Sequence, residues 1–229
     1  MAFRSSILAL DATTNWCSVA WTDGSQWVER NELAGQRHSE LILAMVDAVL
    51  REARTSLRML TEIAFGAGPG SFTGLRIACG IAQGLAFGAG VPVRPVSSLA
   101  ALAQASGRHA VVTALDARMN EVYWAAYRAS PAGEWETIAA PAVAAPVGVT
   151  LPAGTGWAGV GNGFAAYPGL AERPGSALSD VDATVRVTAR AIAELALAGY
   201  GVTGAAEFAV PHYVRDRVAQ TSAERNGTA

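Results

Sequence analysis

Lysine is absent from the sequence, so all 17 of its basic side chains are arginines. Charge of either sign is also scarce, because charged residues make up 16% of the 229 residues whereas hydrophobic residues make up 51%. This balance excludes a disordered chain and provides apolar side chains for one large domain or two small ones. With a net charge of −2 and no run of arginines, the chain alone is predicted to bind nucleic acid poorly, and a role on RNA would need a partner.

Histidine and cysteine are equally scarce. The three histidines, His38, His109 and His212, lie far apart, and no pair has the three- or four-residue spacing of a helical metal site. The two cysteines, Cys17 and Cys79, have no metal-ligand spacing and are predicted to be free buried thiols of a reducing compartment. A G-x-S-x-G motif is missing as well, so no nucleophile and base arrangement supports a peptidase.

Targeting and membrane segments are not expected. The apolar run at the N-terminus reaches Asp11 too soon for a signal peptide. Residues 77–93 carry no formal charge, but these 17 residues include four glycines, Gln83 and Pro92, and they barely reach the lower length limit of a membrane helix. We expect a soluble protein of the cytoplasm.

The most distinctive stretch is residues 66–88, which read GAGPGSFTGLRIACGIAQGLAFG. A short buried strand is expected at residues 63–65, and the glycines and Pro69 after it force a turn. Either Ser71 or Thr73 is a suitable helix cap. Beyond them, apolar residues recur at three- and four-residue steps, which predicts a helix buried on one side.

A second stripe on this helix consists of Gly80, Gly84 and Gly88. Glycine inside a helix costs about 1 kcal/mol relative to alanine, so a compensating contact is expected. The usual reason is the close approach of another backbone, and we interpret this helix as one packed tightly on a neighbour or a partner. On this interpretation, replacing Ala82 with Trp would abolish complex formation while leaving the fold largely intact.

A glycine-rich loop between a strand and a helix also suggests a phosphate site, because helix N-termini attract anions. Two standard motifs fail here. A Walker A loop needs Gly-Lys-Ser/Thr, but Arg76 is the nearest cation. A dinucleotide fingerprint needs an acidic residue about twenty positions after its glycines, where residues 87–91 offer none. A tight turn with close helix packing is therefore favoured over a bound phosphate.

The first half of the chain is predicted to follow the order βββαβαβα. The first three strands form an antiparallel meander, the helix after Gly35 carries a continuous apolar stripe, and Ser97 or Ser98 caps the last helix. The expected strands are residues 6–11, 17–21, 26–33, 63–65 and 91–96, and the expected helices are residues 38–51, 73–88 and 97–106.

The pattern restarts at His109. Residues 9–12, Ala-Leu-Asp-Ala, recur as residues 114–117, and Asn15 recurs as Asn120 at the same offset of 105 residues. Both copies end a strand and begin a hairpin, which predicts a duplicated domain. We therefore divide the chain into an N-terminal lobe at residues 1–106, a C-terminal lobe at 107–215 and a tail at 216–229 that is predicted to be disordered.

The second half is less regular. Strands are expected at residues 122–128, 135–140 and 157–161, and a helix at 184–198, which Gly199 ends. The Ala- and Pro-rich residues 139–154 show no period and are interpreted as a surface excursion with at most a short strand or helix. Residues 168–179 are interpreted as a loop.

Two acidic residues stand at the ends of strands in the two copies. Asp11 is followed by Thr13 and Thr14 in its turn, and Asp116 holds the matching place in the second copy. Hydroxyls and turn amides of this kind face phosphate oxygens in nucleotide sites, while the acid holds a water or Mg²⁺. The alternative is that each Asp only accepts hydrogen bonds from its turn. The first turn also lacks a glycine that would let its backbone approach a phosphate.

Several motifs resemble a known family. Residues 68–77, GPGSFTGLRI, match almost letter for letter the signature of the TsaB (YeaZ) family, bacterial partner proteins in threonylcarbamoyladenosine synthesis on tRNA. The resemblance runs from residue 7 to residue 215. Further matches are residues 7–11 (ILALD), 38–40 (HSE), 116–119 (DARM) with 121–123 (EVY), and 211–215 (P-x-Y-x-R).

The resemblance implies the α/β fold of the actin-like ATPases (the ASKHA, ribonuclease H-like fold) with two duplicated βββαβαβα lobes, in agreement with the internal repeat. It also implies a non-catalytic subunit that binds and activates the transferase TsaD, with the ATPase TsaE, for N6-threonylcarbamoyladenosine formation at adenosine 37 of ANN-decoding tRNAs. The tRNA would be reached only through the complex. The catalytic subunit carries two metal-binding histidines four residues apart on its first helix, whereas here His38 is followed by Ile42, so that site is missing.

The resemblance further implies that the first two helices contact TsaD, or a second copy when the chain is alone as a homodimer. No catalytic residue and no metal ligand is expected, and no cofactor is firmly implied, although ATP or ADP with Mg²⁺ fits the partner interface. The expected partner-binding residues are His38, Leu41, Ile42, Met45, Phe72, Leu75, Arg76, Cys79, Gly80, Gln83 and Gly84.

An alternative from a different class stays open. Asp11, Thr13, Thr14 and Asp116, which are candidate remnants of phosphate loops, would serve a stand-alone ATP-dependent transferase or kinase. The missing lysine and histidine ligands weigh against it.

Overall fold

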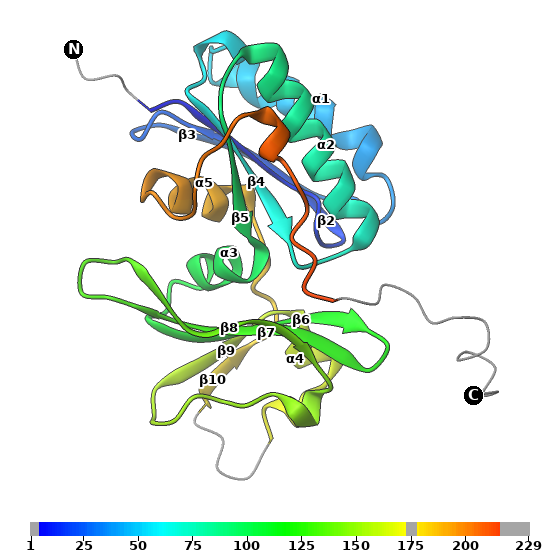
Figure 1. Cartoon of the computed structure of the whole chain (residues 1–229), viewed down its shortest axis with the longest axis vertical. Helices are drawn as coiled ribbons and strands as arrows, with labels where there is room; N and C mark the ends of the chain where they lie inside the picture. Colours follow the sequence, from blue (N-terminus) through cyan, green and yellow to red (C-terminus); the bar gives the residue numbers. More distant parts are fainter. Residues whose placement is uncertain (1–4, 173–177, 216–229) are drawn as a thin grey trace, which may run out of the picture.

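The computed structural model describes residues 5–172 and 178–215, whose strands form two mixed sheets of five strands each (Figure 1). The expected tail at residues 216–229 lies outside the described residues. The first sheet has the order β3-β2-β1-β4-β5, with β1 (Ile7–Asp11), β2 (Trp16–Thr22), β3 (Trp27–Leu33), β4 (Glu62–Gly68) and β5 (Val93–Ser97). The second sheet has the order β8-β7-β6-β9-β10, with β6 (Ala110–Arg118), β7 (Glu121–Ala129), β8 (Trp135–Ala144), β9 (Trp157–Val160) and β10 (Leu178–Asp182).

The two sheets repeat one topology. In each, the first strand pairs antiparallel with the second and parallel with the fourth, the third strand lies outside the second, and the fifth strand runs parallel beside the fourth. The α/β class and the duplication predicted from the repeated Ala-Leu-Asp-Ala are therefore confirmed.

Five helices accompany the sheets in the described residues. They are α1 (His38–Glu52), α2 (Phe72–Ala89), α3 (Ser98–Ala105), α4 (Asn162–Ala166) and α5 (Ala189–Leu197), with short 3-10 turns at η1 (Leu57–Met59), η2 (Pro146–Gly148), η3 (Pro168–Leu170) and η4 (Ala206–Phe208). Of the alternative caps predicted for each helix, the structure has Ser71 at α2 and Ser97 at α3. The Ser71 hydroxyl accepts from Gly74 N–H, and the Ser97 hydroxyl accepts from Ala100 N–H. These hydroxyls satisfy amides that have no partner within the helix.

The second half departs from the predicted order. Between β8 and β9 it has only η2 where the first half has α1, so its order is βββ-βαβα. Strand β8 extends to Ala144, into the stretch predicted as a surface excursion, and β10 begins within the predicted loop at residues 168–179. The sequence Leu-Ser-Asp-Val-Asp of β10 has no alternating apolar pattern, because this strand lies at the exposed edge of its sheet beside β9. Helix α5 begins at Ala189 after its Thr188 cap, five residues later than predicted.

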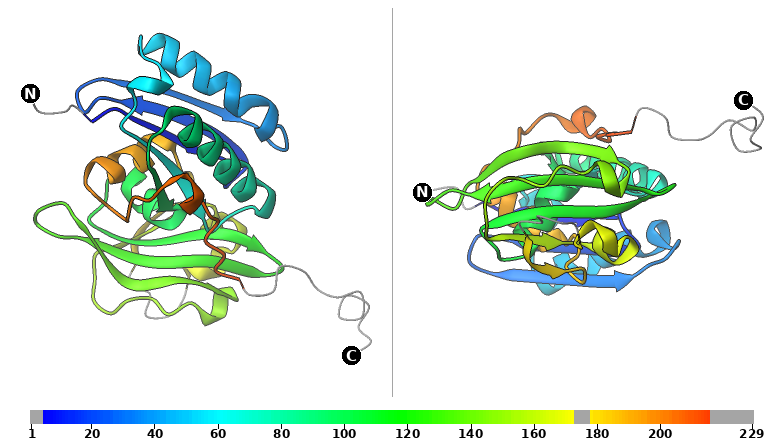
Figure 2. Two further views of the ribbon diagram at one scale, coloured as in Figure 1. Left: turned by 45° about the horizontal axis from the view of Figure 1, so that its top comes forward. Right: turned by 90° about the horizontal axis from the view of Figure 1, so that it is seen from below.

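The helices form layers on the sheets. Helices α1 and α2 cover one face of the first sheet, whereas α3 and α5 lie between the two sheets (Figures 1 and 2). Helix α5, although it belongs to the second half of the sequence, packs on β1, β2 and β4 of the first sheet. One buried apolar cluster therefore runs through both sheets and includes Ala9, Leu102, Leu115, Tyr127 and Ile192. The two lobes share this cluster, and each lobe also has a buried apolar cluster of its own.

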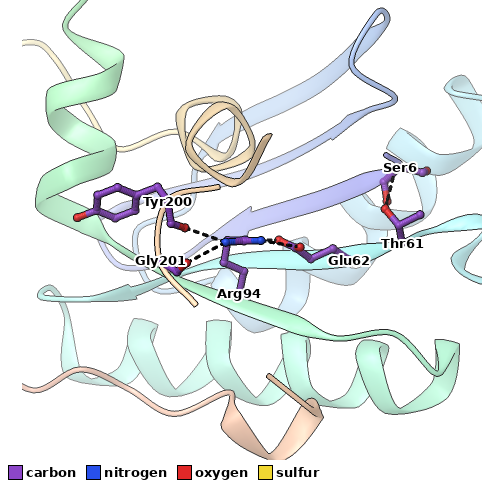
Figure 3. Close-up of polar contacts among 6 residues, drawn as sticks. All are labelled: Ser6, Thr61, Glu62, Arg94, Tyr200 and Gly201. Atoms are coloured by element: carbon purple, nitrogen blue, oxygen red, sulfur yellow. Dashed lines mark hydrogen bonds and ion pairs between the residues drawn. The ribbon is translucent and has the colours of Figure 1, made fainter. Parts of the chain in front are cut away.

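A mostly buried ion pair links the chain after α5 to the first sheet (Figure 3). The Arg94 guanidinium on β5 pairs with both carboxylate oxygens of Glu62 on β4, at 2.5 and 3.0 Å. It also donates to the carbonyls of Tyr200 and Gly201, each at 3.1 Å. The two charged side chains are 12% and 13% exposed. Arg94 therefore fixes the end of α5 beside β5.

Among the described residues, only helix α2 is long and apolar enough to cross a membrane by length and composition. A third of this helix is buried inside the protein. It packs on β4 as a surface-layer helix of its sheet. Cys17 and Cys79 are free and buried, as predicted, and burial raises the pKa of both thiols to about 12.

Candidate functional site: the cleft between the lobes and the exposed face of α2

A cleft with a volume of about 900 Å³ opens between the two lobes. The first lobe contributes the β1–β2 turn and the starts of α1 and α2, the second contributes the β6–β7 hairpin and the start of α4, and residues 212–215 form a further wall. Its polar and aromatic lining includes Thr13, Thr14, Asn15, Gln36, His38, Ser71, Phe72, Thr73, Asp116, Arg118, Tyr123, Asn162, His212, Tyr213 and Arg215.

Asp11 does not line this cleft, contrary to the expected role at a phosphate. Its side chain is fully buried at the end of β1, where Oδ1 accepts from the Thr13 hydroxyl at 2.8 Å and Oδ2 accepts from Thr13 N–H at 3.2 Å. Burial raises the pKa of this carboxyl to about 7, and the two hydrogen bonds from Thr13 only partly oppose that rise. Asp11 therefore offers no oxygen to a metal or water in the cleft.

The turn after Asp11 is held by the chain itself. Thr13 is buried, and its hydroxyl accepts from the Ser98 hydroxyl while its carbonyl accepts from Ser71 N–H at 2.7 Å. The Thr14 hydroxyl accepts from Trp16 N–H at 3.2 Å and lines the cleft. Of the first-lobe candidates, Thr13 and Thr14 thus reach the cleft wall, and both serve the turn.

The glycines that begin the distinctive stretch are explained by this close packing. A Cβ added to Gly74 would lie 1.9 Å from the Ala12 carbonyl oxygen, and one added to Gly70 would lie 2.4 Å from the Thr13 carbonyl oxygen. A Cβ on Gly66 would lie 2.1 Å from Asp11 Oδ1. These glycines let the start of α2 and the β1–β2 turn touch, which is the packing explanation favoured from the sequence.

Asp116 differs from its repeat partner because it reaches the cleft. Its carboxylate accepts from Arg118 N–H at 2.8 Å, pairs with the Arg118 guanidinium at 3.0 Å and accepts from the Tyr167 hydroxyl at 3.4 Å. Its own N–H donates to Asn162 Oδ1. Both Asp11 and Asp116 therefore accept from the amide two residues later, the turn pattern that the sequence left open as the alternative.

His38, the first residue of α1, lies in the cleft wall and is 6% exposed. Its Nε2 is buried and has no hydrogen-bond partner in the described part of the chain. Ile42, one turn later, is fully buried in the core. Across residues 5–172 and 178–215, no three His, Cys, Asp or Glu side chains lie close enough together to hold a metal ion.

The expected partner-binding residues divide by exposure. Ile42, Met45, Leu75 and Cys79 are buried in the chain's own core, so their periodicity reflects packing on the first sheet. Leu41 is half-buried. The exposed members lie at three- and four-residue steps along α2, and Phe87, which is 83% exposed, continues them. We call this surface the α2 face: Phe72, Arg76, Gly80, Gln83, Gly84 and Phe87.

Phe87 was missed at the sequence level, although it follows Gly84 by three residues and Gln83 by four, which places it on the same side of the helix. Arg76 lies over the Phe72 ring at 3.8 Å, so the first turn of the α2 face carries both a cation and an aromatic ring. A Cβ on Gly80, Gly84 or Gly88 would meet nothing within 4 Å. No neighbour within the described chain therefore accounts for this glycine stripe.

Comparisons with known proteins give a family model described as TsaD and relatives named TsaB. Residues 31–158 match the family model described as TsaD, tRNA N6-adenosine threonylcarbamoyltransferase. The tRNA threonylcarbamoyladenosine biosynthesis protein TsaB of Escherichia coli K12 is 41% identical over 228 residues, which covers 93% of this chain and 96% of that protein. The TsaB protein of Haemophilus influenzae is 50% identical over 123 residues, 52% of each chain.

Solved structures give the same result. YeaZ from Pseudomonas aeruginosa has a TM-score of 0.81 at 40% identity and covers 91% of this chain and 99% of its own. A second Pseudomonas aeruginosa structure, described as having similarity to peptidase YeaZ, has a TM-score of 0.85 at 39% identity and covers 92% and 100%. The chain belongs to the TsaB (YeaZ) family of tRNA threonylcarbamoyladenosine biosynthesis proteins.

Proposed function

We propose that this chain is a non-catalytic, cytoplasmic subunit that binds and activates a TsaD-type transferase, with TsaE, for N6-threonylcarbamoyladenosine formation at adenosine 37 of ANN-decoding tRNAs. The α2 face docks the transferase, and in its absence the same face joins two copies into a homodimer. The chain reaches tRNA only through the complex.

The observation that carries this proposal is the open glycine stripe. Gly80, Gly84 and Gly88 each lower the intrinsic stability of α2 by about 1 kcal/mol relative to alanine. The glycines at the start of α2 are matched by close contacts within the chain, whereas these three have open space above them. Phe72 and Phe87 are exposed on the same side. A second helix packed on this face would bury both rings and use the missing side chains for close approach.

The inner arrangement of the cleft supports a non-catalytic role. Asp11, the acid best placed by sequence for Mg²⁺, is enclosed by its own turn, and Asp116 is already engaged by Arg118 and Tyr167. The stand-alone ATP-dependent transferase stays as the second candidate because a cleft of about 900 Å³ is large enough for a nucleotide. ATP or ADP with Mg²⁺ at the partner boundary is compatible with either.

The test is a calorimetric titration of the purified chain with the TsaD-type protein of the same organism. We expect the Gly84→Trp variant to lose at least about 100-fold in affinity, because an indole would hold the two helices apart. Its unfolding temperature should not fall, because a Cβ at Gly84 has no neighbour within 4 Å among the described residues and Trp has a higher helix propensity than Gly. Ala82→Trp, which was expected to leave the fold largely intact, is not suitable for this test. Ala82 is fully buried, so a Trp at that position would disrupt the core.

The matched control is Thr137→Trp on the exposed part of β8, which should bind like the parent. Binding of Gly84→Trp within threefold of the parent would remove the α2 face from the interface. A parallel titration with ATP and Mg²⁺ separates the two candidate functions, since tight binding with turnover by the chain alone would favour the transferase.

A further inference from the structure

Three motifs singled out in the sequence meet at one place in the structure. They are residues 68–77, residues 116–123 and residues 211–215, and the proposed docking function uses only the first. The last of them belongs to the C-terminal strap, residues 209–215, which leaves η4 beside α2 and crosses to the second sheet (Figure 2, left, orange to red). Residues 212–215 form one wall of the cleft.

On the first lobe, the strap is seated at the end of β4. His212 N–H donates to the Ala67 carbonyl at 2.7 Å. A Cβ on Gly68 would lie 2.8 Å from the His212 carbonyl oxygen, and Gly68 has a φ of +118°, so both the close approach and the backbone conformation require glycine there.

The next strap residue contacts the α2 face. The Tyr213 ring lies 5.8 Å from the Phe72 ring, centroid to centroid, at an interplanar angle of 33°. Arg76 Nε donates to the Tyr213 hydroxyl at 3.2 Å while its guanidinium covers Phe72. Phe72, Arg76 and Tyr213 thus form one cluster, shared between α2 and the strap.

On the second lobe, two residues further along, the strap is held by Arg215. Its guanidinium pairs with Glu121 at the start of β7, donates to the Ala117 carbonyl at 3.2 Å and lies 5.8 Å from the Tyr123 ring centroid. The Arg215 side chain is only 14% exposed. It holds a hairpin in which Met119 has a φ of +54°, a conformation that needs support from its surroundings.

These contacts lie across the cleft from the shared apolar core. Between the sheets, α3 and α5 join the lobes through the continuous cluster that contains Leu102 and Ile192. At the cleft, the strap joins them through the Tyr213–Phe72 ring contact on the first lobe and the ion pair and hydrogen bond of Arg215 on the second. In this arrangement the shared core can act as a hinge between the lobes, and the strap can hold the lobes together at the cleft.

We propose that the strap is a latch: Tyr213 and Arg215 hold the two lobes at their present separation and thereby set the position of Phe72 and Arg76 on the α2 face. The partner binds the latched form. Because both the partner and Tyr213 contact the first turn of α2, opening the latch lowers the fraction of chains competent to bind and reduces the apparent affinity by that fraction. This last clause rests on the proposed docking function, whereas the latch itself does not.

The first measurement uses the chain alone. Spin labels at Asp47→Cys on α1 and Glu136→Cys on β8 report the distance between the lobes, and the buried Cys17 and Cys79 stay unlabelled. We expect Arg215→Ala to broaden the distance distribution and to speed hydrogen exchange of the His212 amide at least tenfold. Arg118→Ala is the matched control, since that side chain is 87% exposed on the same hairpin and pairs with Asp116. It should change neither readout.

The second measurement is partner affinity. Arg215→Ala should bind about tenfold more weakly, and Tyr213→Phe, which loses only the bond from Arg76, should show a smaller effect in the same direction and serves if Arg215→Ala does not fold. Unchanged lobe distances and exchange in both variants would overturn the latch. Changed distances with parent-like affinity would overturn its coupling to the partner. Failure of the docking function appears separately, because Gly84→Trp would then bind normally with the distances of the parent.

Discussion

Asp11 is an acid at the end of a strand whose side chain does not reach the cleft. The carboxyl stands at the end of β1, as a metal-holding acid would, but Thr13 encloses it and separates it from the cleft. Its pKa is raised to about 7 by burial, so the carboxyl is partly protonated near neutral pH. When protonated, it can donate to the Thr13 hydroxyl, which then donates to Ser98.

The raised pKa of Asp11 makes the stability of the fold depend on pH. The folded state holds the proton more tightly than the unfolded chain, where the carboxyl has its usual pKa of 3.8. The stabilising contribution of the Asp11 proton to the free energy of unfolding is therefore complete below about pH 4 and is lost as pH rises to about 7. We expect Asp11→Asn, which has no charge to bury, to gain about 3 kcal/mol relative to the parent between about pH 5 and pH 8. Urea unfolding at the two pH values measures the difference.

The control for this series is Asp47→Asn, an exposed acid of α1 that pairs with Arg51. It should follow the parent at both pH values to within about 0.5 kcal/mol. Parallel pH profiles for Asp11→Asn and the parent would show that the carboxyl stays ionised in the folded state.

Helix α2 combines two kinds of glycine. Gly74 is buried against the Ala12 carbonyl, where an added Cβ would lie at 1.9 Å, whereas Gly80 faces open space. Gly74→Ala should therefore destabilise the fold by about 1 to 3 kcal/mol, because two backbones must move apart. Gly80→Ala should stabilise it by about 0.5 to 1 kcal/mol through helix propensity. Urea unfolding of the two variants compares them directly, and equal shifts of the same sign would contradict the assignment of the two glycines.

The elements were predicted well where local pattern decides them. Strand β1, the helix caps at Ser71 and Ser97 and the repeated hairpin at Asp116 follow from residue type and spacing. Strand β10 was missed because its edge position leaves no apolar pattern. The spacing of α2 identified its buried apolar stripe, but the family resemblance does not separate the two sides of the helix, so buried Leu75 was grouped with exposed Phe72.

The candidate site was predicted less completely, because its walls come from distant parts of the chain. Arg215 reaches Glu121 across 94 residues of sequence, and Arg76 reaches Tyr213 across 137. The motifs that contain Arg76 and Arg215, residues 68–77 and 211–215, were recognised in the sequence. Their meeting depends on the placement of the strap over Gly68, which no local propensity encodes.

The two lobes are linked because each contributes a helix that packs on the sheet of the other. Helix α5 follows β10 of the second sheet but packs on β1, β2 and β4 of the first, and α3 packs on β6 and β7. A boundary drawn at residue 106 therefore divides the strands of the two sheets but cuts through their common core. We expect the two sheets to unfold in one transition, because the face of each sheet that contributes to the shared cluster is covered only in the presence of the other lobe.

Arg94 gives this coupling a test. Removing its side chain would leave Glu62, 13% exposed, without its cation and would free the Tyr200 and Gly201 carbonyls that position the end of α5. Breaking one side of such a pair costs about 3 to 5 kcal/mol, so Arg94→Ala should lower the stability of both sheets by that amount in urea. Arg108→Ala, which opens the exposed pair with Asp180, should cost no more than about 1 kcal/mol. Hydrogen exchange of amides in β1 and β6 reads the two sheets separately. A loss confined to β1 would show that the lobes unfold independently, because the link through α5 would then carry no stability to the second sheet.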